Sequence, residues 1–155
     1  MNAVDRRIVD LLQQDATQSI ADIAEHVHLS TAACWRRVQK LKDDGVIRRH
    51  VALCDPQKLN VGVTVFVMVR TSQHNPAWLE RFASGVSQIA EVVEFYRMSG
   101  EIDYMLRVVV PDIQGYDRVY KKLIGIAELA DVSSSFAMEQ IKYTTALPLD
   151  YVEGK

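Results

Sequence analysis

The stretch LSTAACWRRVQKLKDDG, residues 29–45, decides the fold of the N-terminal part of the chain. Ser30 is a favoured residue at the start of a helix, and Gly45 is the residue type most often found where a helix ends in a left-handed turn. Three apolar residues between these ends recur within a narrow arc of a helical wheel: Cys34, Val38 and Leu41. The stretch therefore predicts a helix with one buried face.

Two shorter helices are predicted before this one. Asn2 can cap a helix over residues 3–14, whose apolar side chains form a single stripe. Ser19 and Asp22 have the layout of a capping box, which predicts a second helix that ends near His26. Three short helices joined by tight turns are typical of a helix-turn-helix, whose last helix enters the major groove of DNA.

The opposite face of the third helix carries the residues that we predict to contact DNA. Together with the start of the helix, they are Ser30, Thr31, Ala32, Trp35, Arg36, Gln39 and Lys40. Cationic side chains suit phosphates, glutamine suits a base edge, and small residues allow a close approach to the groove. Two alternatives stay open here. Trp35 could pack against a neighbouring helix, and Arg37, at the edge of the buried arc, could form a salt bridge within the protein.

Residues 46–53, after the third helix, are rich in β-branched and basic residues, as expected of a wing beside the recognition helix. Arg48 and Arg49 are then predicted to contact phosphates, each contributing about one unit to the salt dependence of DNA binding. Residues 36–49 contain six basic and two acidic side chains, a balance of +4 in a chain of net charge −2. This favours a polyanionic partner for the N-terminal part, the alternative being an ordinary solvated surface.

The bulk composition indicates a soluble protein with folded cores, since 48% of its 155 residues are hydrophobic. The longest apolar run, residues 61–69, is far shorter than the roughly 20 residues of a membrane span, and the N-terminus lacks the apolar segment of a signal peptide. We therefore expect a cytoplasmic location. Cys34 and Cys54 are too few for a disulfide framework and have no metal-binding spacing with the histidines, so neither a metal nor a cofactor is expected.

The rest of the chain predicts a second domain. The polar residues 54–60 include a proline and are predicted to link a DNA-binding domain at 1–53 to a domain at 61–155. Apolar runs predict four strands, at 61–69, 92–98, 102–110 and 132–143. One helix is predicted to begin at Asn75-Pro76 and a second at Pro111-Asp112. The second helix is expected to bury Ile113, Tyr116, Val119, Tyr120 and Leu123.

The element order βαββαβ is that of the ferredoxin-like fold, a four-stranded antiparallel sheet with both helices on one face. The whole chain is thus predicted to be α+β, a winged helix-turn-helix followed by a ferredoxin-like domain. The strand at 61–69 is apolar on both sides, and Met105 and Val109 lie on the side of the third strand that the helices leave open. A second copy of the chain is expected to cover this open face, which predicts a homodimer.

Four segments resemble motifs of the Lrp/AsnC family, the feast/famine regulators, in the family's order: residues 5–15, 29–38, 43–47 and 100–104. The resemblance covers nearly the whole chain. Residues 134–145 are similar in particular to the DecR-type subgroup, which is associated with the catabolism of cysteine and sulfur amino acids. Glu101 and Ile102 depart from that subgroup, in which an aromatic residue usually precedes the position of Asp103.

The resemblance implies that dimers assemble into octamers or related multimers and bind small effectors, usually amino acids, between effector domains. By position, the effector pocket would comprise Met98, Gly100, Glu101, Ile102, Asp103, Tyr104, Ser133, Ser134 and Ser135. Turn amides and serine hydroxyls could donate to the carboxylate of an amino acid, and Asp103 could accept from its ammonium group. The alternative is that Asp103 caps the hairpin turn and the serines bond to the local backbone. The subgroup favours a sulfur or medium-sized apolar amino acid as effector.

The sequence therefore predicts a sequence-specific transcriptional regulator of amino-acid metabolism, without enzymatic activity. One alternative is an enzyme resembling sirohaem decarboxylases, which share this architecture. Such an enzyme would need basic residues and histidines around a macrocycle, whereas the cationic cluster here lies on the predicted recognition helix and wing. No Ser/His/Asp, Cys/His or paired-carboxylate motif is apparent. A further alternative is an architectural protein that compacts DNA without responding to an effector.

Overall fold

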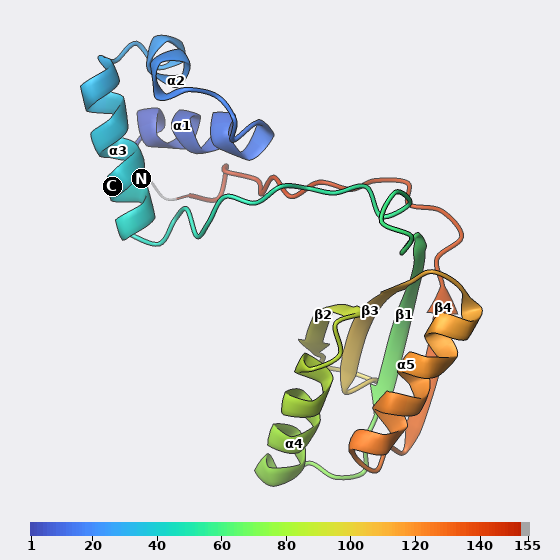
Figure 1. Cartoon of the computed structure of the whole chain (residues 1–155). Coiled ribbons are helices and arrows are strands. Elements are labelled where there is room, and N and C mark those ends of the chain that lie inside the picture. Colours follow the sequence, from blue (N-terminus) through green and yellow to red (C-terminus); the bar gives the residue numbers. More distant parts are fainter. Residues whose placement is uncertain (153–155) are drawn as a thin grey trace. The chain divides into compact units, whose positions relative to one another are not determined.

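Three helices form the N-terminal unit in the computed structural model, which describes residues 1–152 (Figure 1). They are α1 (Ala3–Gln14), α2 (Ile20–His26) and α3 (Thr31–Asp43). The predicted bounds of all three are confirmed to within two residues. Contacts along the chain divide it into two units, residues 1–52 with 141–152 and residues 53–140, which are described separately below.

Local hydrogen bonds explain where the three helices begin. The side chain of Asn2 accepts from the Asp5 amide, and the Asp5 carboxylate accepts from the Asn2 amide in return. Ser19 and Asp22 form the same reciprocal capping box, as the sequence predicted. The Ser30 hydroxyl accepts from the amide of Ala33 and so caps α3. Each cap contributes about 1 kcal/mol to helix stability.

The inward faces of the helices form one apolar core. Its buried members are Ile8, Val9, Ile23, Ala24, Val27, Cys34, Val38 and Leu41. The three residues predicted for α3 are all among them. Burial of each large aliphatic side chain contributes about 1.5–3 kcal/mol to folding. This core fixes which face of α3 is left for solvent.

The segment after α3, predicted to be the wing, follows the helix as an extended chain and not as a strand. Gly45 adopts a φ of +73°, the left-handed conformation that ends the helix. Residues 46–53 then run on without strand hydrogen bonding, although Ile47 donates from its amide to the Leu41 carbonyl and packs on the core. A strand forms where a neighbouring strand pairs with its backbone groups. Within residues 1–152, no strand pairs with residues 46–53.

The C-terminal segment, residues 141–152, belongs to the helical unit and not to the sheet. Gln13 of α1 forms two hydrogen bonds with the backbone of Leu147: its Nε2 donates to the carbonyl at 3.1 Å, and its Oε1 accepts from the amide at 2.8 Å. Leu149 packs against the helical core. We expected this segment to belong to the domain at 61–155, whereas it leaves the sheet and packs on the helices.

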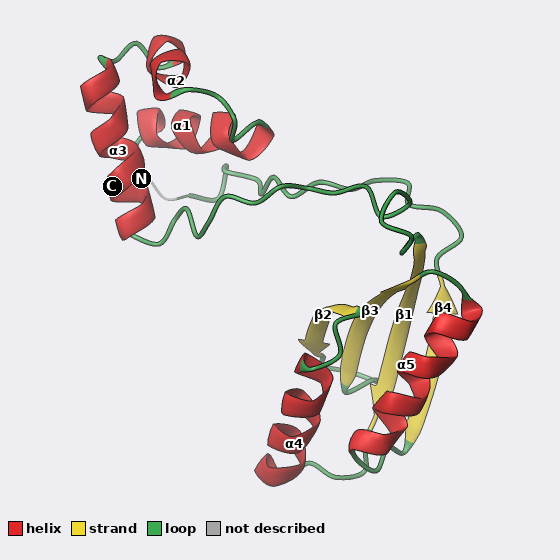
Figure 2. Cartoon of the chain, viewed as in Figure 1, coloured by secondary structure: helices red, strands yellow, loops and turns green. Residues whose placement is uncertain are grey.

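The second unit has the element order βαββαβ, which confirms the ferredoxin-like prediction. Its elements are β1 (Val63–Arg70), α4 (Pro76–Ser87), β2 (Val92–Arg97), β3 (Tyr104–Val110), α5 (Ile113–Ile126) and β4 (Asp131–Phe136). The strands are antiparallel in the order β2-β3-β1-β4. Figure 2 shows both helices on the same face of the sheet. The last strand was predicted to continue to Tyr143 but ends at Phe136.

The core of this unit lies between the sheet and its two helices. Alternate residues of β1 and β3 point into it: Val65, Val67, Val69, Tyr104, Leu106, Val108 and Val110. Three residues from each helix pack against them: Trp78, Phe82 and Val86 from α4, and Tyr116, Val119 and Leu123 from α5. The prediction that Ile113 is inward is wrong, since its side chain is 67% exposed in the first turn of α5.

The open face of the sheet is partly apolar. The alternation along the strands places Phe66, Met68, Met105 and Val109 there, each only partly buried in one chain. Glu94 and Arg107, paired in register on the same face, form an ion pair with an O···N distance of 2.6 Å. The Tyr96 hydroxyl donates to Glu94, which raises the pKa of Tyr96. The face therefore combines apolar side chains with one fixed polar group.

Both Cys34 and Cys54 are free thiols, the first buried and the second exposed. Burial raises the pKa of the Cys34 thiol, because the thiolate would lose its hydration. Cys34 therefore acts as a small apolar core residue. Within residues 1–152, no helix is both long and apolar enough to cross a membrane. In the same part of the chain, no three His, Cys, Asp or Glu side chains gather as metal ligands would.

Candidate functional site

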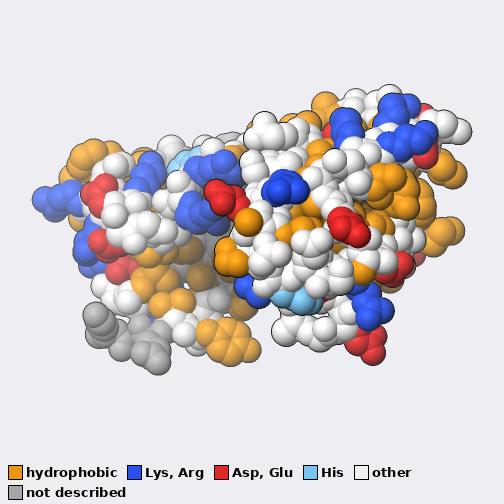
Figure 3. All heavy atoms as spheres, turned by 90° about the horizontal axis from the view of Figure 1, so that it is seen from below, with side chains coloured by type: hydrophobic (Ala, Val, Ile, Leu, Met, Phe, Trp, Pro, Cys, Tyr) orange, Lys and Arg blue, Asp and Glu red, His pale blue; other side chains and the backbone are white. Residues whose placement is uncertain are grey.

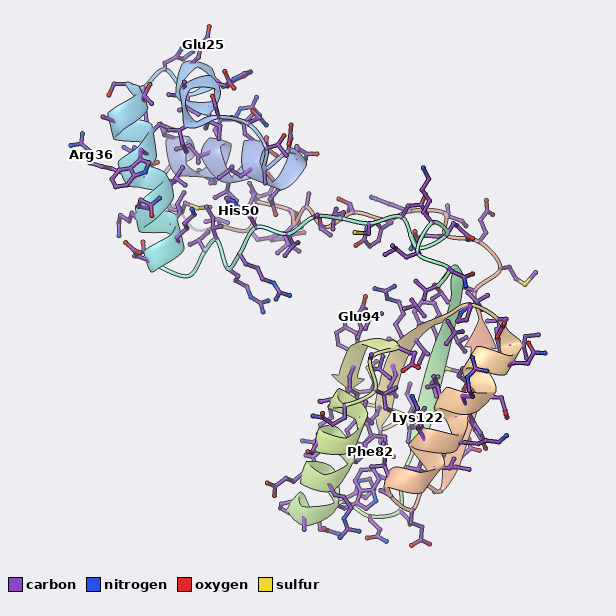
Figure 4. The ribbon with its side chains drawn as sticks, in the orientation of Figure 1. Glu25, Arg36, His50, Phe82, Glu94 and Lys122 are labelled. Atoms are coloured by element: carbon purple, nitrogen blue, oxygen red, sulfur yellow. The ribbon has the colours of Figure 1, made fainter. Side chains whose placement is uncertain are left out.

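The outward face of α3 is free for a partner. Seven of the nine side chains predicted to contact DNA lie on α3 or at its start, and of these only Gln39 is partly buried. Trp35 is 53% exposed, so about half of its surface is open to a partner. Figure 4 shows Arg36 pointing away from α1 and α2. In the left-hand part of Figure 3, which shows this unit, Lys and Arg side chains lie on the surface.

Arg37 has the structural role that the sequence left open. Its Nη1 donates to Oδ1 of Asp5 on α1, at 2.7 Å, and both side chains are partly buried. The pair joins the first and third helices of the unit. Arg37 therefore orients α3, whereas its neighbour Arg36 remains available to a ligand.

Lys40 is exposed but already has a partner. Its Nζ lies 2.8 Å from Oδ2 of Asp44, one turn further along the chain. This hydrogen bond, with the charge of the same carboxylate, raises the pKa of Lys40. The charge of Lys40 is thus partly neutralised at the surface. Among the residues assigned to phosphates, Arg48 and Arg49 are the stronger candidates.

A shallow basic depression follows α3. Its volume is about 340 Å³, and it is lined by Lys42, Ile47, Arg48, Arg49 and His50. Three of these five residues are Lys or Arg, and Ile47 anchors the segment to the core. The depression thus offers several donors to phosphate oxygens close to the end of α3.

In the second unit, Asp103 is held by the strand next to it. Its Oδ2 accepts from the Thr71 amide at 2.8 Å, and its own amide donates to the Val69 carbonyl at 3.0 Å. Its carbonyl accepts from the Met98 amide at 2.8 Å, which closes the turn between β2 and β3. Gly100 in that turn has a φ of +117°, a conformation that few other residues adopt. Asp103 thus caps the start of the β1–α4 loop.

The three predicted serines do not share one face of the sheet. Ser133 and Ser135 pair in register with Met68 and Phe66 and are exposed, which places them on the open face. Ser134 points the other way, and its hydroxyl bonds to that of Tyr116. Burial raises the pKa of this tyrosine. One chain therefore does not bring the serines and the β2–β3 turn into a common cavity.

A cavity of about 230 Å³ opens beside that turn. Three residues of the predicted effector set line it: Met98, Asp103 and Tyr104. Six further lining residues were missed: Gln73, His74, Asn75, Pro76, Leu79 and Arg97. The polar run at 71–75, directly after an apolar strand, was the one available signal in the sequence. Gly100, Glu101 and Ile102 are not among the lining residues.

A helix-turn-helix unit joined to a ferredoxin-like unit with its own cavity defines a class of two-domain regulators, in which one unit binds DNA and the other binds a ligand. Comparison with known families agrees. Residues 1–48 match the winged helix-turn-helix DNA-binding domain, and residues 64–147 match the Lrp/AsnC ligand binding domain. The chain belongs to the Lrp/AsnC family of transcriptional regulators.

Individual relatives cover almost the whole chain. The DNA-binding transcriptional activator DecR of Escherichia coli K12 is 48% identical over 97% of this chain and 99% of its own. The crystal structure of an AsnC family regulator from Agrobacterium tumefaciens is 61% identical, with a TM-score of 0.96, covering 99% of this chain and 100% of its own. A transcriptional regulator from Neisseria meningitidis, solved in complex with L-Met, is 31% identical over 97% of each chain, with a TM-score of 0.92.

Proposed function

We propose that this protein regulates genes of amino-acid metabolism by binding specific double-stranded DNA and that an amino acid, bound by its second unit, changes this binding. The observation that carries the proposal is the division of α3 into two faces. Cys34, Val38 and Leu41 are buried on one face, whereas the other face exposes Trp35 and Arg36 to solvent. A polar, cationic helix face of this kind suits the major groove.

Each part of the DNA-binding unit has its own task in this proposal. Ser30, Thr31 and Ala32 are small and exposed, which permits a close approach at the start of α3. Arg36 and Gln39 hydrogen-bond to base edges and supply specificity. Arg48 and Arg49 contact phosphates, which supply affinity for any sequence, and Lys40 adds a weaker contact of the same kind.

The effector is proposed to be a sulfur or medium-sized apolar amino acid. The relative from Neisseria meningitidis was solved with L-Met, which supports an amino acid of this type. The turn between β2 and β3 is the proposed centre of the site, with Asp103 as the acceptor for the ammonium group. Two exposed serines, Ser133 and Ser135, would reach an effector only from the open face of the sheet.

The open face supports the proposal of a homodimer. Phe66, Met68, Met105 and Val109 form an apolar surface that a second copy would remove from water. Further association of dimers into octamers or related multimers is part of the same proposal. As members of this family are transcriptional regulators, we propose no catalytic activity and place the protein in the cytoplasm with the chromosome.

A titration of DNA tests this function. The full-length protein is added to its own upstream region and, separately, to random DNA of equal length at the same salt concentration. A regulator binds the upstream region at least about a thousandfold more tightly. Equal affinity for both would instead indicate an architectural protein. Absence of binding to either DNA would contradict the proposal and make binding of a haem precursor the next test.

A further inference from the structure

Trp35 is the only large hydrophobic side chain exposed on α1, α2 and α3, which all lie within residues 1–152. Just over half of its surface, 53%, is open to solvent. None of the aromatic ring pairs found in the described part of the chain includes it. A single exposed hydrophobic residue is ordinary in a folded protein, so its position on the helix decides what it can do.

The ring of Trp35 lies on the face of α3 that is proposed to enter the major groove. Four residues of this face fall within about 100° of a helical wheel, opposite the buried side chains: Ala32, Trp35, Arg36 and Gln39. Ala32, one turn before Trp35, is also exposed. The face therefore has an apolar part near the start of α3, followed by a polar part that can form hydrogen bonds.

One base carries an apolar group in the major groove. All four bases present hydrogen-bond donors or acceptors there, but thymine alone adds a methyl group, at C5. Arg36 and Gln39 suit the donors and acceptors. The carbon surface of Ala32 and Trp35 suits the methyl group, because contact between them removes both from water. Phosphate oxygens, the other groups at the groove, are charged and would lose hydration against an aromatic ring.

We propose that Trp35, with Ala32 beside it, contacts the 5-methyl group of a thymine in the operator and is a specificity-determining residue of the DNA-binding unit. Four residues of an α-helix rise about 6 Å, or about two base-pair steps along the groove. The thymine therefore lies within about two base pairs of the base that Gln39 contacts. The inference rests on the proposed DNA-binding function, and adds to it one base that is selected by hydrophobic contact.

Replacement of single thymines by deoxyuridine tests this contact, because it removes the methyl group and leaves every hydrogen-bonding group of the base in place. The full-length protein is titrated with its own upstream DNA, in which one thymine at a time is replaced. At least one replacement should weaken binding by the natural protein about fourfold, the loss expected when one methyl group leaves an apolar contact. Trp35→Ala should bind the unmodified DNA more weakly and should no longer respond to that replacement. Trp35→Phe, which keeps an aromatic ring, should respond to it.

Gln39→Ala is the matched control, because it removes a hydrogen-bonding side chain from the same face one turn further along α3. It should weaken binding to the upstream DNA and keep the fourfold effect of the methyl group. Random DNA, bound through its phosphates, should be bound by all variants within about twofold of the natural protein, which shows that they fold.

Three results would overturn the inference while the proposed function stands. The first is that no deoxyuridine replacement weakens binding. The second is an equal methyl effect in Trp35→Ala and the natural protein, because another residue would then contact the methyl group. The third is a Trp35→Ala protein with natural affinity for the upstream DNA, which would leave the ring for a protein partner. If the natural protein does not prefer the upstream DNA to random DNA, both proposals fail.

Discussion

Arg37 of α3 and Asp5 of α1 form an ion pair at 2.7 Å, whereas Arg36, the next residue, points away from both neighbouring helices. Two adjacent arginines of α3 thus have different surroundings. Arg37 sets the orientation of α3 within its unit, and Arg36 is left for the ligand. The first predictions test this division.

Arg37→Met keeps the apolar stem of the side chain and removes its charge. Because Asp5 is partly buried and loses its partner, we expect a loss of about 1–2 kcal/mol in the free energy of unfolding. Thermal or urea unfolding measures it. Arg36→Met is the control and should leave stability unchanged within about 0.5 kcal/mol. Equal stability of the two variants would show that the ion pair does not hold α3.

Arg36→Ala and Gln39→Ala should each weaken binding to the specific site by about 1–3 kcal/mol if the side chain contacts a base edge. Affinity for random DNA should change much less. Arg48→Ala should weaken binding to both kinds of DNA alike and reduce the slope of log affinity against log salt by about one. Titrations at several salt concentrations measure all of these effects. Unaltered specificity in both α3 variants would contradict the docking of α3 in the major groove.

Asp103→Asn separates the charge of this residue from its structural role. The amide oxygen of asparagine can still accept from Thr71, so the fold and DNA binding should persist while the amino-acid response is lost. Asp103→Ala also leaves the Thr71 amide unpaired, with a further loss of about 1 kcal/mol in the free energy of unfolding. The measurements are urea unfolding and DNA titration with the effector. A full response in Asp103→Asn would exclude the ammonium contact.

Leu149→Ala tests whether the C-terminal segment stabilises the DNA-binding unit. Its side chain packs on the helical core while partly exposed, so we expect a loss of about 1–2 kcal/mol in the free energy of unfolding. Leu147→Ala is a close control, because its side chain is 72% exposed and its hydrogen bonds to Gln13 come from the backbone. Hydrogen exchange in α1 should rise in the first variant alone. Equal exchange in both would contradict the role of Leu149.

Met68→Lys places a charge on the open face of the sheet. If a second copy covers that face, burying the ammonium group without a partner should shift the protein to monomers. Sedimentation of the free protein measures this shift. Ile124→Lys, on the exposed side of α5, should leave the association state unchanged. A Met68→Lys protein that remains dimeric would place the interface elsewhere.

Features set by neighbouring residues were predictable from the sequence. Asn2, Ser19 and Ser30 cap their helices through bonds to residues three positions away, so their roles can be inferred from spacing alone. The buried face of α3 and the order of elements in the ferredoxin-like unit follow in the same way from the periodicity of apolar residues. The prediction that Ile113 is buried was wrong. It extended the apolar periodicity of α5 into the first turn, where this side chain does not reach the core.

Features set by tertiary pairing were not predictable. Residues 46–53 and 137–143 have strand-like composition, yet neither segment is a strand, because a strand also requires a neighbour. The cavity depends on the register that puts Arg97 opposite Tyr104, and on the loop after β1, which Asp103 holds from the turn between β2 and β3. No local sequence pattern indicates that His74 and Arg97 line the same cavity. The sequence therefore indicated Met98, Asp103 and Tyr104 but not the other six residues that line the cavity.

The most direct test of the central claim is the dissociation constant of the full-length protein for its own upstream DNA, measured with and without each amino acid of a panel. We expect a sulfur or medium-sized apolar amino acid, such as L-methionine, to shift this constant while binding to random DNA stays the same. An upstream affinity that no amino acid changes would contradict the account.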